Sequence, residues 1–323
     1  MVKKSWVILL VFAFLLMVPS IALFAQYGME QAKGDLATIA QGLSDIFGPN
    51  LGSMTFICDP VGYSTIPHLA LGVAGGIAFI PAENISMGTN LEYDFGDLKA
   101  IPLPAVGAYG KINLKGLEVG AKLAGIPQIE NKDAGFEVNN MILGGKVRLR
   151  IIDKKLAVLR MGLSVGGFFD YINGNISMIG RDTIDIMEDV TGDGTKENIG
   201  TVETETGFKT EWKGFSAGGE AQANFQLLLF NFFVGGRVGK SFGKATTDIS
   251  GSATLTPISG YEEYVDSITD EITITKEAKP EGIEVNLFGG AEVKLLIFSL
   301  GVRGGYNINN GNFTVDGGAR LQF

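Results

Sequence analysis

The chain has 323 residues, of which 46 are glycine and 19% are charged, and its formal net charge is −9. Glycine is about twice as frequent as in an average protein, but the positive mean hydropathy and the lack of a Gly-X-Y period exclude a disordered or collagen-like chain. The acidic balance argues against a nucleic-acid partner, because such proteins usually carry a basic face. A single cysteine, Cys58, excludes an internal disulfide.

The N-terminus has the parts of a secretory signal peptide. A short basic region precedes an apolar run from Trp6 to Val18, and small residues follow it. We therefore predict a signal peptide over residues 1–25, cleaved after Ala22 or Ala25. A transmembrane anchor is the alternative, but the apolar run is shorter than the roughly 20 residues with which a helix spans a bilayer.

Residues 26–50 form an N-terminal segment with a helical pattern. Apolar residues recur at spacings of three and four over residues 29–47, which predicts an amphipathic helix, and Gly48 with Pro49 ends it. Its apolar stripe must be buried inside the barrel as a plug, against the periplasmic rim, or in a membrane surface, so this helix is a candidate plug.

From residue 51 to the C-terminus the hydrophobic period is two. Between Met141 and Ile151, for example, apolar residues alternate with a set that includes Lys146, Arg148 and Arg150. Three basic residues at alternate positions are not compatible with a packed soluble core. The pattern therefore favours strands with a lipid-facing and a lumen-facing side over a soluble β-sandwich, which is the alternative fold.

The connections between these strands alternate in length. Short turns alternate with longer connections, and the longest are residues 172–211 and 243–282. Transmembrane barrels have short periplasmic turns and long external loops. We predict an all-β fold, an antiparallel transmembrane β-barrel over residues 51–323 with about 12 strands, and 10 or 14 strands as alternatives. The count of 12 takes residues 52–58 as the first strand and residues 86–95 as a weaker one.

The C-terminal sequence "VDGGARLQF" supports this class. It resembles the C-terminal signal of Gram-negative outer-membrane β-barrel proteins, in which a terminal aromatic residue follows alternating apolar residues. The resemblance implies that Leu321 and Phe323 form an assembly signal, and that the protein's partners are outer-membrane lipid and the barrel-assembly machinery. Leu321 stands where the family more often has an aromatic residue.

A second resemblance concerns the N-terminal segment. The string "FGPNLGSM" before the barrel is similar to the hatch region of the long-chain fatty-acid transporter family, which carries an Asn-Pro-Ala element. This sequence has Pro49, Asn50 and Leu51 instead, so the order of the element differs.

The predicted lumen carries charges of both signs, whereas the long loops are acidic. Residues 172–211 hold nine acidic and three basic residues, and residues 243–282 hold eight and three. Glu118, Glu284 and Asp316 also belong to the inward-facing set. The charged residues that we predict to face the lumen as candidate site residues are Lys111, Lys122, Lys146, Arg148, Arg150, Arg160, Glu220, Arg237, Glu292, Lys294, Arg303 and Arg320.

Few residues offer catalytic or metal chemistry. The single histidine, His68, lies at the start of a predicted strand with no nucleophile motif beside it, so we predict no enzymatic activity and no catalytic residue. The string "DVTGDGTKE" places Asp189, Asp193 and Glu197 at positions one, five and nine of a calcium-loop pattern. The twelfth position, where a bidentate Glu is expected, is Gly200. A Ca²⁺ site and an ordinary acidic turn both remain open; no other cofactor is expected.

The sequence leaves two functions open. The first is an outer-membrane channel or transporter for small or hydrophobic solutes, because 12 strands lie between the eight that side chains fill and the roughly 16 that leave an aqueous pore. The alternative is a non-conducting, surface-exposed barrel with an adhesion or structural role. Neither the substrate nor the oligomeric state follows from the sequence.

Overall fold

The computed structural model describes residues 29–56, 68–81, 100–114, 116–131, 135–189, 196–260 and 267–323. The helices are α2 (Met29–Phe47) and α3 (Leu51–Thr55), and neither is long and apolar enough to cross a membrane. The strands are β1 (His68–Pro81), β2 (Ala100–Leu114), β3 (Leu117–Asn131), β4 (Phe136–Leu156), β5 (Leu159–Glu188), β6 (Glu197–Leu227), β7 (Phe230–Pro257), β8 (Ile268–Ala278), β9 (Glu284–Leu295), β10 (Phe298–Asn307) and β11 (Phe313–Gln322).

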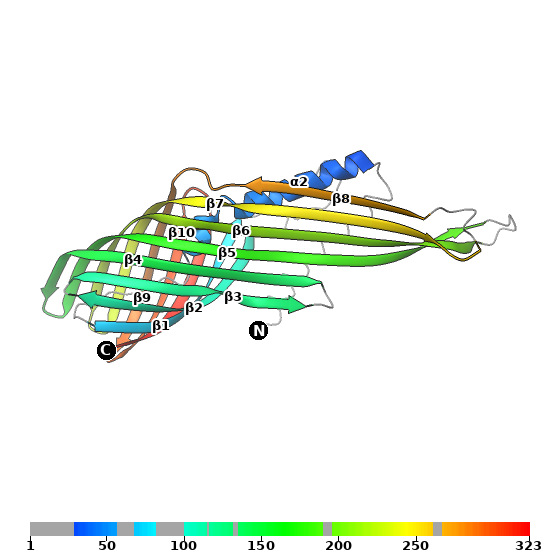
Figure 1. The fold of residues 1–323 in the computed structure, drawn as a ribbon. Coiled ribbons are helices and arrows are strands. Elements are labelled where there is room, and N and C mark those ends of the chain that lie inside the picture. The colour runs from blue at the N-terminus through cyan, green and yellow to red at the C-terminus, as the bar shows by residue number, and fades with distance from the viewer. Residues whose placement is uncertain are drawn as a thin grey trace.

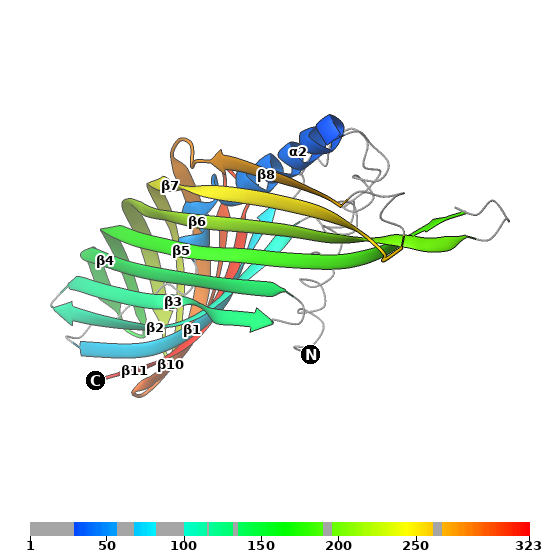
Figure 2. The ribbon, with the colours of Figure 1, turned by 45° about the vertical axis from the view of Figure 1, so that its right-hand side comes forward.

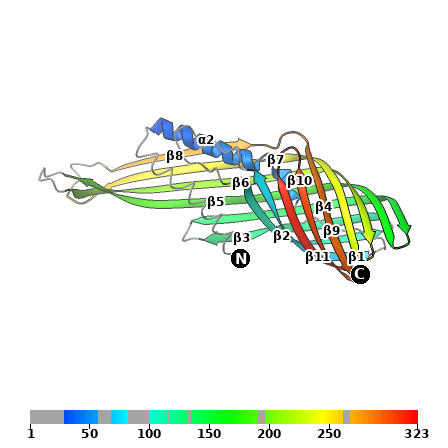
Figure 3. The ribbon, with the colours of Figure 1, turned by 180° about the vertical axis from the view of Figure 1, so that it is seen from behind.

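The strands form a closed antiparallel barrel. Consecutive strands pair from β1 to β7, β7 pairs with β9, β9 with β10, β10 with β11, and β11 with β1 (Figures 1 and 3). All eleven described strands except β8 belong to this ring, so it has ten strands. The predicted all-β barrel with a short N-terminal helix is confirmed, and the strand number is ten, which was one of the alternatives to 12.

The assignment of residues 52–58 as the first strand is wrong. Residues Leu51–Thr55 are helical and Phe56 lies in a turn, with all six residues buried inside the ring. The ring closes without this segment, because β1 pairs directly with β11 over ten residue pairs. Residues 57–58, and the weaker strand predicted at 86–95, lie outside the described residues.

An apolar band with aromatic edges surrounds the ring. Outward-facing residues such as Val73, Val106 and Val234 are more than half exposed, whereas one chain neighbour of each, Ala74, Ala105 and Phe233, is buried. Phenylalanine rings pack side by side at one edge, where the centroid of Phe215 lies 5.8 Å from that of Phe169 and 4.9 Å from that of Phe242. The opposite edge carries exposed aromatic residues as well: Phe225, Phe230, Phe232 and Phe323. Aromatic girdles of this kind mark the two interfaces of a membrane.

Three strands of the ring, β5, β6 and β7, continue far beyond the band. β5 and β6 contain 30 and 31 residues. They pair from Leu159 with Leu227 at one end to Glu188 with Glu197 at the other. The segments predicted as loops, 172–211 and 243–282, are therefore largely strands (Figure 1). At about 3.3 Å per residue, the part of β5 after Tyr171 extends about 55 Å along the strand. We call this projecting region, formed by residues 126–131, 136–140, 172–188, 197–214, 243–257 and 268–278, the external sheet.

β7 changes its partner where it leaves the barrel. Its first part, Phe230 to Gly239, pairs with β9, and its later part, Ala245 to Leu255, pairs with β8. Gly243 lies between the two parts with φ +134°, and a Cβ there would come within 2.2 Å of the Lys213 carbonyl oxygen. Glycine therefore permits the kink at which the ring ends and the external sheet begins.

The two helices lie at different levels. α2 packs along β7 and β8 of the external sheet, as Figure 2 shows, and buries Leu36, Ile39 and Leu43 against them. The predicted helix over residues 29–47 is thus present with the same bounds. α3 contacts β5, β6, β7 and β9 inside the ring, below α2.

Interior glycines make room for aromatic rings. A Cβ on Gly72 would meet the ring of Tyr109 at 2.5 Å, and one on Gly235 would meet Phe288 at 2.4 Å. The same holds for Gly290 against Phe233, where the separation would be 2.4 Å. Part of the high glycine content is therefore explained by aromatic side chains that lie over glycines of the neighbouring strand.

Candidate functional site

The structure places most of the predicted lumen charges in the closed interior of the ring. Nine of the twelve are buried, and their exposed fractions range from 1% for Lys111 to 8% for Lys146. Arg150, Arg160 and Lys294 are partly exposed, and they lie near the short turns. The buried nine are Lys111, Lys122, Lys146, Arg148, Glu220, Arg237, Glu292, Arg303 and Arg320. In an open aqueous pore such side chains would be accessible to water.

A network around Glu118 lies in the interior of the ring near the short turns. Arg148 donates to Glu118 from Nε at 3.0 Å, and Lys111 Nζ lies 3.3 Å from the same carboxylate. Glu220 lies 3.5 Å from Arg148 Nε and 3.9 Å from Lys146 Nζ, and Arg148 also donates to Gln222 at 2.6 Å. Strands β2, β3, β4 and β6 thus contribute to one ion-paired cluster.

A second cluster also lies in the interior of the ring near the short turns. Arg320 of β11 forms an ion pair with Glu292 of β9, and Asn231 of β7 donates to Glu292 at 3.2 Å. Both charged side chains are at most 3% exposed. We call the two clusters together the ionic layer: Lys111, Glu118, Lys146, Arg148, Glu220, Glu292 and Arg320.

Two further ion pairs lie closer to the external end. Asp170 pairs with Arg237 and lies 3.4 Å from Lys122 Nζ, and Asp316 pairs with Arg303, whose Nε donates to it at 3.0 Å. Sequence reasoning did not single out Asp170, although its position between the outward-facing Phe169 and Tyr171 was a sufficient signal. These pairs leave two guanidinium groups directed towards the centre of the ring.

The N-terminal segment occupies that centre. The Arg303 guanidinium lies over the Phe56 ring at 4.2 Å from its centroid, and that of Arg237 lies over the same ring at 5.3 Å. Arg303 also donates to the Phe56 carbonyl oxygen. A cation over an aromatic face is attracted by the ring quadrupole, and the attraction is stronger where water is excluded.

Neighbouring residues of the segment are bound in the same way. Lys122 donates to the Thr55 carbonyl oxygen at 2.5 Å, and Asn307 donates to the Ser53 hydroxyl at 2.7 Å. We call residues 51–56 the plug, since their side chains are buried among strands from opposite sides of the ring. The candidate plug predicted from the sequence was the helix over residues 29–47, but α2 packs on the external sheet, and the segment that occupies the ring is residues 51–56.

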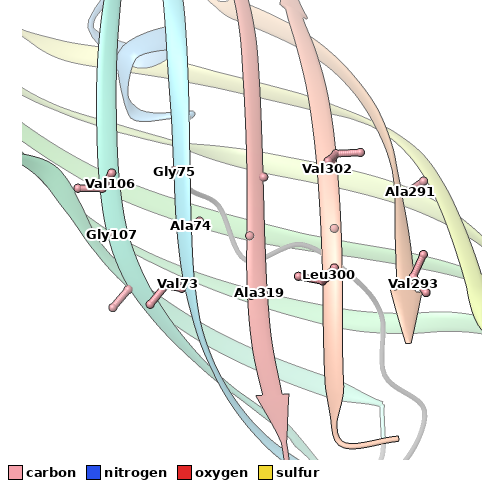
Figure 4. Close-up of a pocket in the computed structure, with 14 residues that line it drawn as sticks. Val73, Ala74, Gly75, Val106, Gly107, Ala291, Val293, Leu300, Val302 and Ala319 are labelled. Carbon is pink, nitrogen blue, oxygen red and sulfur yellow. The ribbon is translucent and has the colours of Figure 1, made fainter. Parts of the chain in front are cut away.

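A large apolar hollow lies on the outer wall. It is lined by small and branched residues of β1, β2, β9, β10 and β11 (Figure 4). Val73, Val106 and Val302, which border it, are 60%, 62% and 61% exposed and belong to the lipid-facing set. The hollow therefore faces the hydrocarbon side, and it is not part of the lumen.

Two of the three predicted calcium residues, Asp189 and Glu197, lie in the part of the chain that the structure describes. Glu197 begins β6 and pairs with Glu188, and Gly200 pairs with Ile186 and Pro257 in the same ladder. Asp189 follows β5, while Asp193 lies outside the described residues. Across the part of the chain that the structure describes, no group of three or more metal-binding side chains occurs. Cys58 and the predicted signal peptide, residues 1–25, also lie outside that part, and His68 is the first residue of β1.

The geometry defines the class of protein. A closed antiparallel ring with an apolar outer band, aromatic girdles and a charged interior is an integral outer-membrane β-barrel. The chain belongs to the Lsa36-like family, whose model matches residues 67–323. The sequence matches no curated protein significantly.

Solved barrels resemble the fold at low similarity. The translocator domain of the autotransporter NalP from Neisseria meningitidis has 10% identity and a TM-score of 0.36, with 89% of this chain and 100% of that chain covered. The CymD monoaromatic hydrocarbon channel has 8% identity and a TM-score of 0.27, with 86% and 98% covered. Ail of Yersinia pestis has 9% identity and a TM-score of 0.21, with 80% and 100% covered. Similarity at this level carries no functional argument.

Proposed function

We propose that this protein is a closed, non-enzymatic outer-membrane barrel that displays an acidic β-sheet outside the membrane for contact with a basic partner surface. The observation that carries the proposal is the filled interior, in which the ionic layer and the plug leave the lumen charges almost inaccessible to water. The alternative of a surface-exposed barrel is thereby favoured over the channel or transporter.

The ionic layer is a strong barrier because its charges are paired across strands. A solute that passed through the ring would have to separate pairs such as Arg320 with Glu292 and Arg148 with Glu118. Leaving one buried charge without its partner costs about 3–5 kcal/mol. Closure by side chains is also expected of a narrow ring, since barrels of about eight strands are filled by their side chains.

The external sheet supplies the functional surface in this proposal. The residues that define it include 13 acidic and five basic side chains, a net charge of −8. Its outer face includes exposed Glu203 and Glu271, together with cross-strand pairs such as Arg181 with Glu205 at 2.7 Å. An acidic field of this kind attracts basic surfaces and is screened by salt within about 10 Å at 0.1 M ionic strength. Outer-membrane lipid and the barrel-assembly machinery are the other partners that we propose.

Conductance tests the closed interior. We expect the intact protein, refolded in a planar bilayer, to give no current steps above those of the bare bilayer. A variant that lacks residues 26–47 should stay closed as well, because the plug and the ionic layer remain. The positive control removes residues 26–56 and replaces Glu118, Arg148, Glu292 and Arg320 by Ser, and it should conduct once folded. Stable current steps from the intact protein would establish the channel instead.

Binding tests the external sheet. We expect the purified barrel in lipid nanodiscs to bind immobilised oligolysine, and not oligoglutamate, at low ionic strength. The double variant Glu203→Gln and Glu271→Gln should bind less, whereas Asp153→Asn, at the opposite end of the barrel, should bind as the parent does. Equal binding by all three proteins would show that the external sheet is not the contact surface.

A further inference from the structure

The chain enters the barrel from the external side. α2 is bound to the external sheet, where the Ser44 hydroxyl lies 3.0 Å from both Thr247 Oγ1 and the Lys276 carbonyl oxygen. The Phe47 ring stacks on Trp212 of β6 with 4.7 Å between centroids. These contacts lie beyond the girdle that Phe215 and Phe242 form. Trp212 is closer than Phe215 to the external end of β6, and Thr247 is closer than Phe242 to the external end of β7.

The next described segments lie progressively further inward. Asn310, in the external connection between β10 and β11, donates to the Pro49 carbonyl oxygen at 2.9 Å. The plug then lies within the ring, where Phe56 packs against Phe288 of β9 and Arg303 of β10. β1 begins at the other end of the ring, since Leu69 pairs with Phe323 next to the short turns. The order along the chain is therefore external side, ring interior, periplasmic end.

This order requires transport of a protein segment. A secreted barrel reaches the outer membrane from the periplasm, so α2 starts on the periplasmic side and ends on the external side. We propose that the barrel carries its own N-terminal segment through the ring during assembly, and that α2 is a surface-displayed element held there by the plug.

The contacts of α2 oppose its return to the periplasm. Its apolar stripe is at most 6% exposed at Leu36, Ile39, Leu43 and Ile46, and it covers Ile249 and Ile272 of the external sheet. Withdrawal would expose both surfaces to water and would also break the plug's hydrogen bonds with Lys122, Arg303 and Asn307.

Cysteine labelling in whole cells tests the location of α2. In a Cys58→Ala background, Gly34→Cys places a thiol on exposed α2, where a Cβ meets no atom within 4 Å. Thr183→Cys in β5 is the external reference, and Lys154→Cys near the short turns is the periplasmic one. We expect a membrane-impermeant maleimide to label positions 34 and 183 equally on intact cells, and position 154 only after the outer membrane is permeabilised.

A disulfide tests the path through the ring. Ser53→Cys with Asn307→Cys should form a bond under oxidation that changes migration on a non-reducing gel, whereas Ser53→Cys with Arg181→Cys should not. Each variant is first checked for heat-modifiable migration, so only folded barrels are compared. Labelling of position 34 only after permeabilisation, or no labelling at all, would overturn the proposal, and so would the absence of the bond between positions 53 and 307. Position 183 reports the external sheet separately, so failure at position 34 leaves the proposed function standing.

Discussion

The backbones of Phe323 and Leu69 exchange two hydrogen bonds. The Phe323 nitrogen lies 2.8 Å from the Leu69 oxygen, and the Leu69 nitrogen lies 3.0 Å from the Phe323 oxygen. This pair extends the register in which β11 and β1 close the ring, with Leu321 opposite Leu71. The residues predicted to form an assembly signal are therefore also residues of the closing seam, and a change there affects both recognition and closure.

We expect removal of Phe323, or Phe323→Asp, to reduce the folded barrel sharply. The Phe323 ring is 66% exposed at the edge of the apolar band, and Asp would place a charge at the lipid interface. Leu321→Asp should also reduce folding, because Leu321 faces lipid with 42% of its surface exposed. The measurement is the heat-modifiable fraction of the outer-membrane protein on a gel. Phe323→Tyr keeps the aromatic ring and should fold normally, and an unchanged yield for Phe323→Asp would contradict the signal.

A second prediction concerns the buried ion pairs. We expect Glu118→Gln to lower the free energy of unfolding by about 3–5 kcal/mol, since it leaves Arg148 and Lys111 with an uncompensated buried charge. The matched control is Glu205→Gln in the exposed pair with Arg181, whose side chain is 75% accessible, and this change should cost about 0–1 kcal/mol. Urea unfolding in lipid vesicles measures both. Similar costs at the two sites would show that the ionic layer is hydrated.

The features with a regular period were predictable from the sequence. The bounds of α2 follow from apolar spacings of three and four, and the lumen side follows from alternation, as with Lys146 and Arg148. Alternation works here because one side meets lipid and the other a polar interior, so the two residue types cannot exchange places. The apolar band and the interior charges were therefore visible before the fold was known.

The plug and the strand ends depend on contacts that a local pattern does not carry. Residues 51–56 contain Thr55 and Phe56, which favour a strand by propensity, but the segment has no free strand edge to pair with and packs as a helix inside the ring. The β4–β5 turn lies at Ala157, with φ 49°, and β4 has a register shift between Arg150 and Ile152 that the alternation of residue types does not reveal. Tertiary pairing decided both outcomes.

A third prediction concerns calcium. We expect Ca²⁺ to leave the melting temperature unchanged, and Asp189→Asn to have no calcium-dependent effect, because Glu197 and Gly200 are held in the β6 ladder instead of curving around a cation. Calorimetry of the intact protein with Ca²⁺ and with a chelator is the measurement. A calcium-dependent rise in melting temperature that Asp189→Asn removes would establish the site.

The last prediction uses two adjacent glycines of β9 with opposite orientations. A Cβ on Gly290 would lie 2.2 Å from the Val302 carbonyl oxygen and 2.4 Å from the Phe233 ring, whereas a Cβ on Gly289 would lie 3.5 Å from its nearest neighbour, the Phe233 carbonyl oxygen. We expect Gly290→Ala to destabilise the barrel by about 1–3 kcal/mol, because the ring of Phe233 and the strand backbone must both shift. Gly289→Ala should be neutral or slightly stabilising, since it faces lipid and restricts the unfolded chain. Urea unfolding in vesicles compares the two. Adding Phe233→Leu to Gly290→Ala should recover part of the loss, and no recovery would show that the ring is not the obstacle.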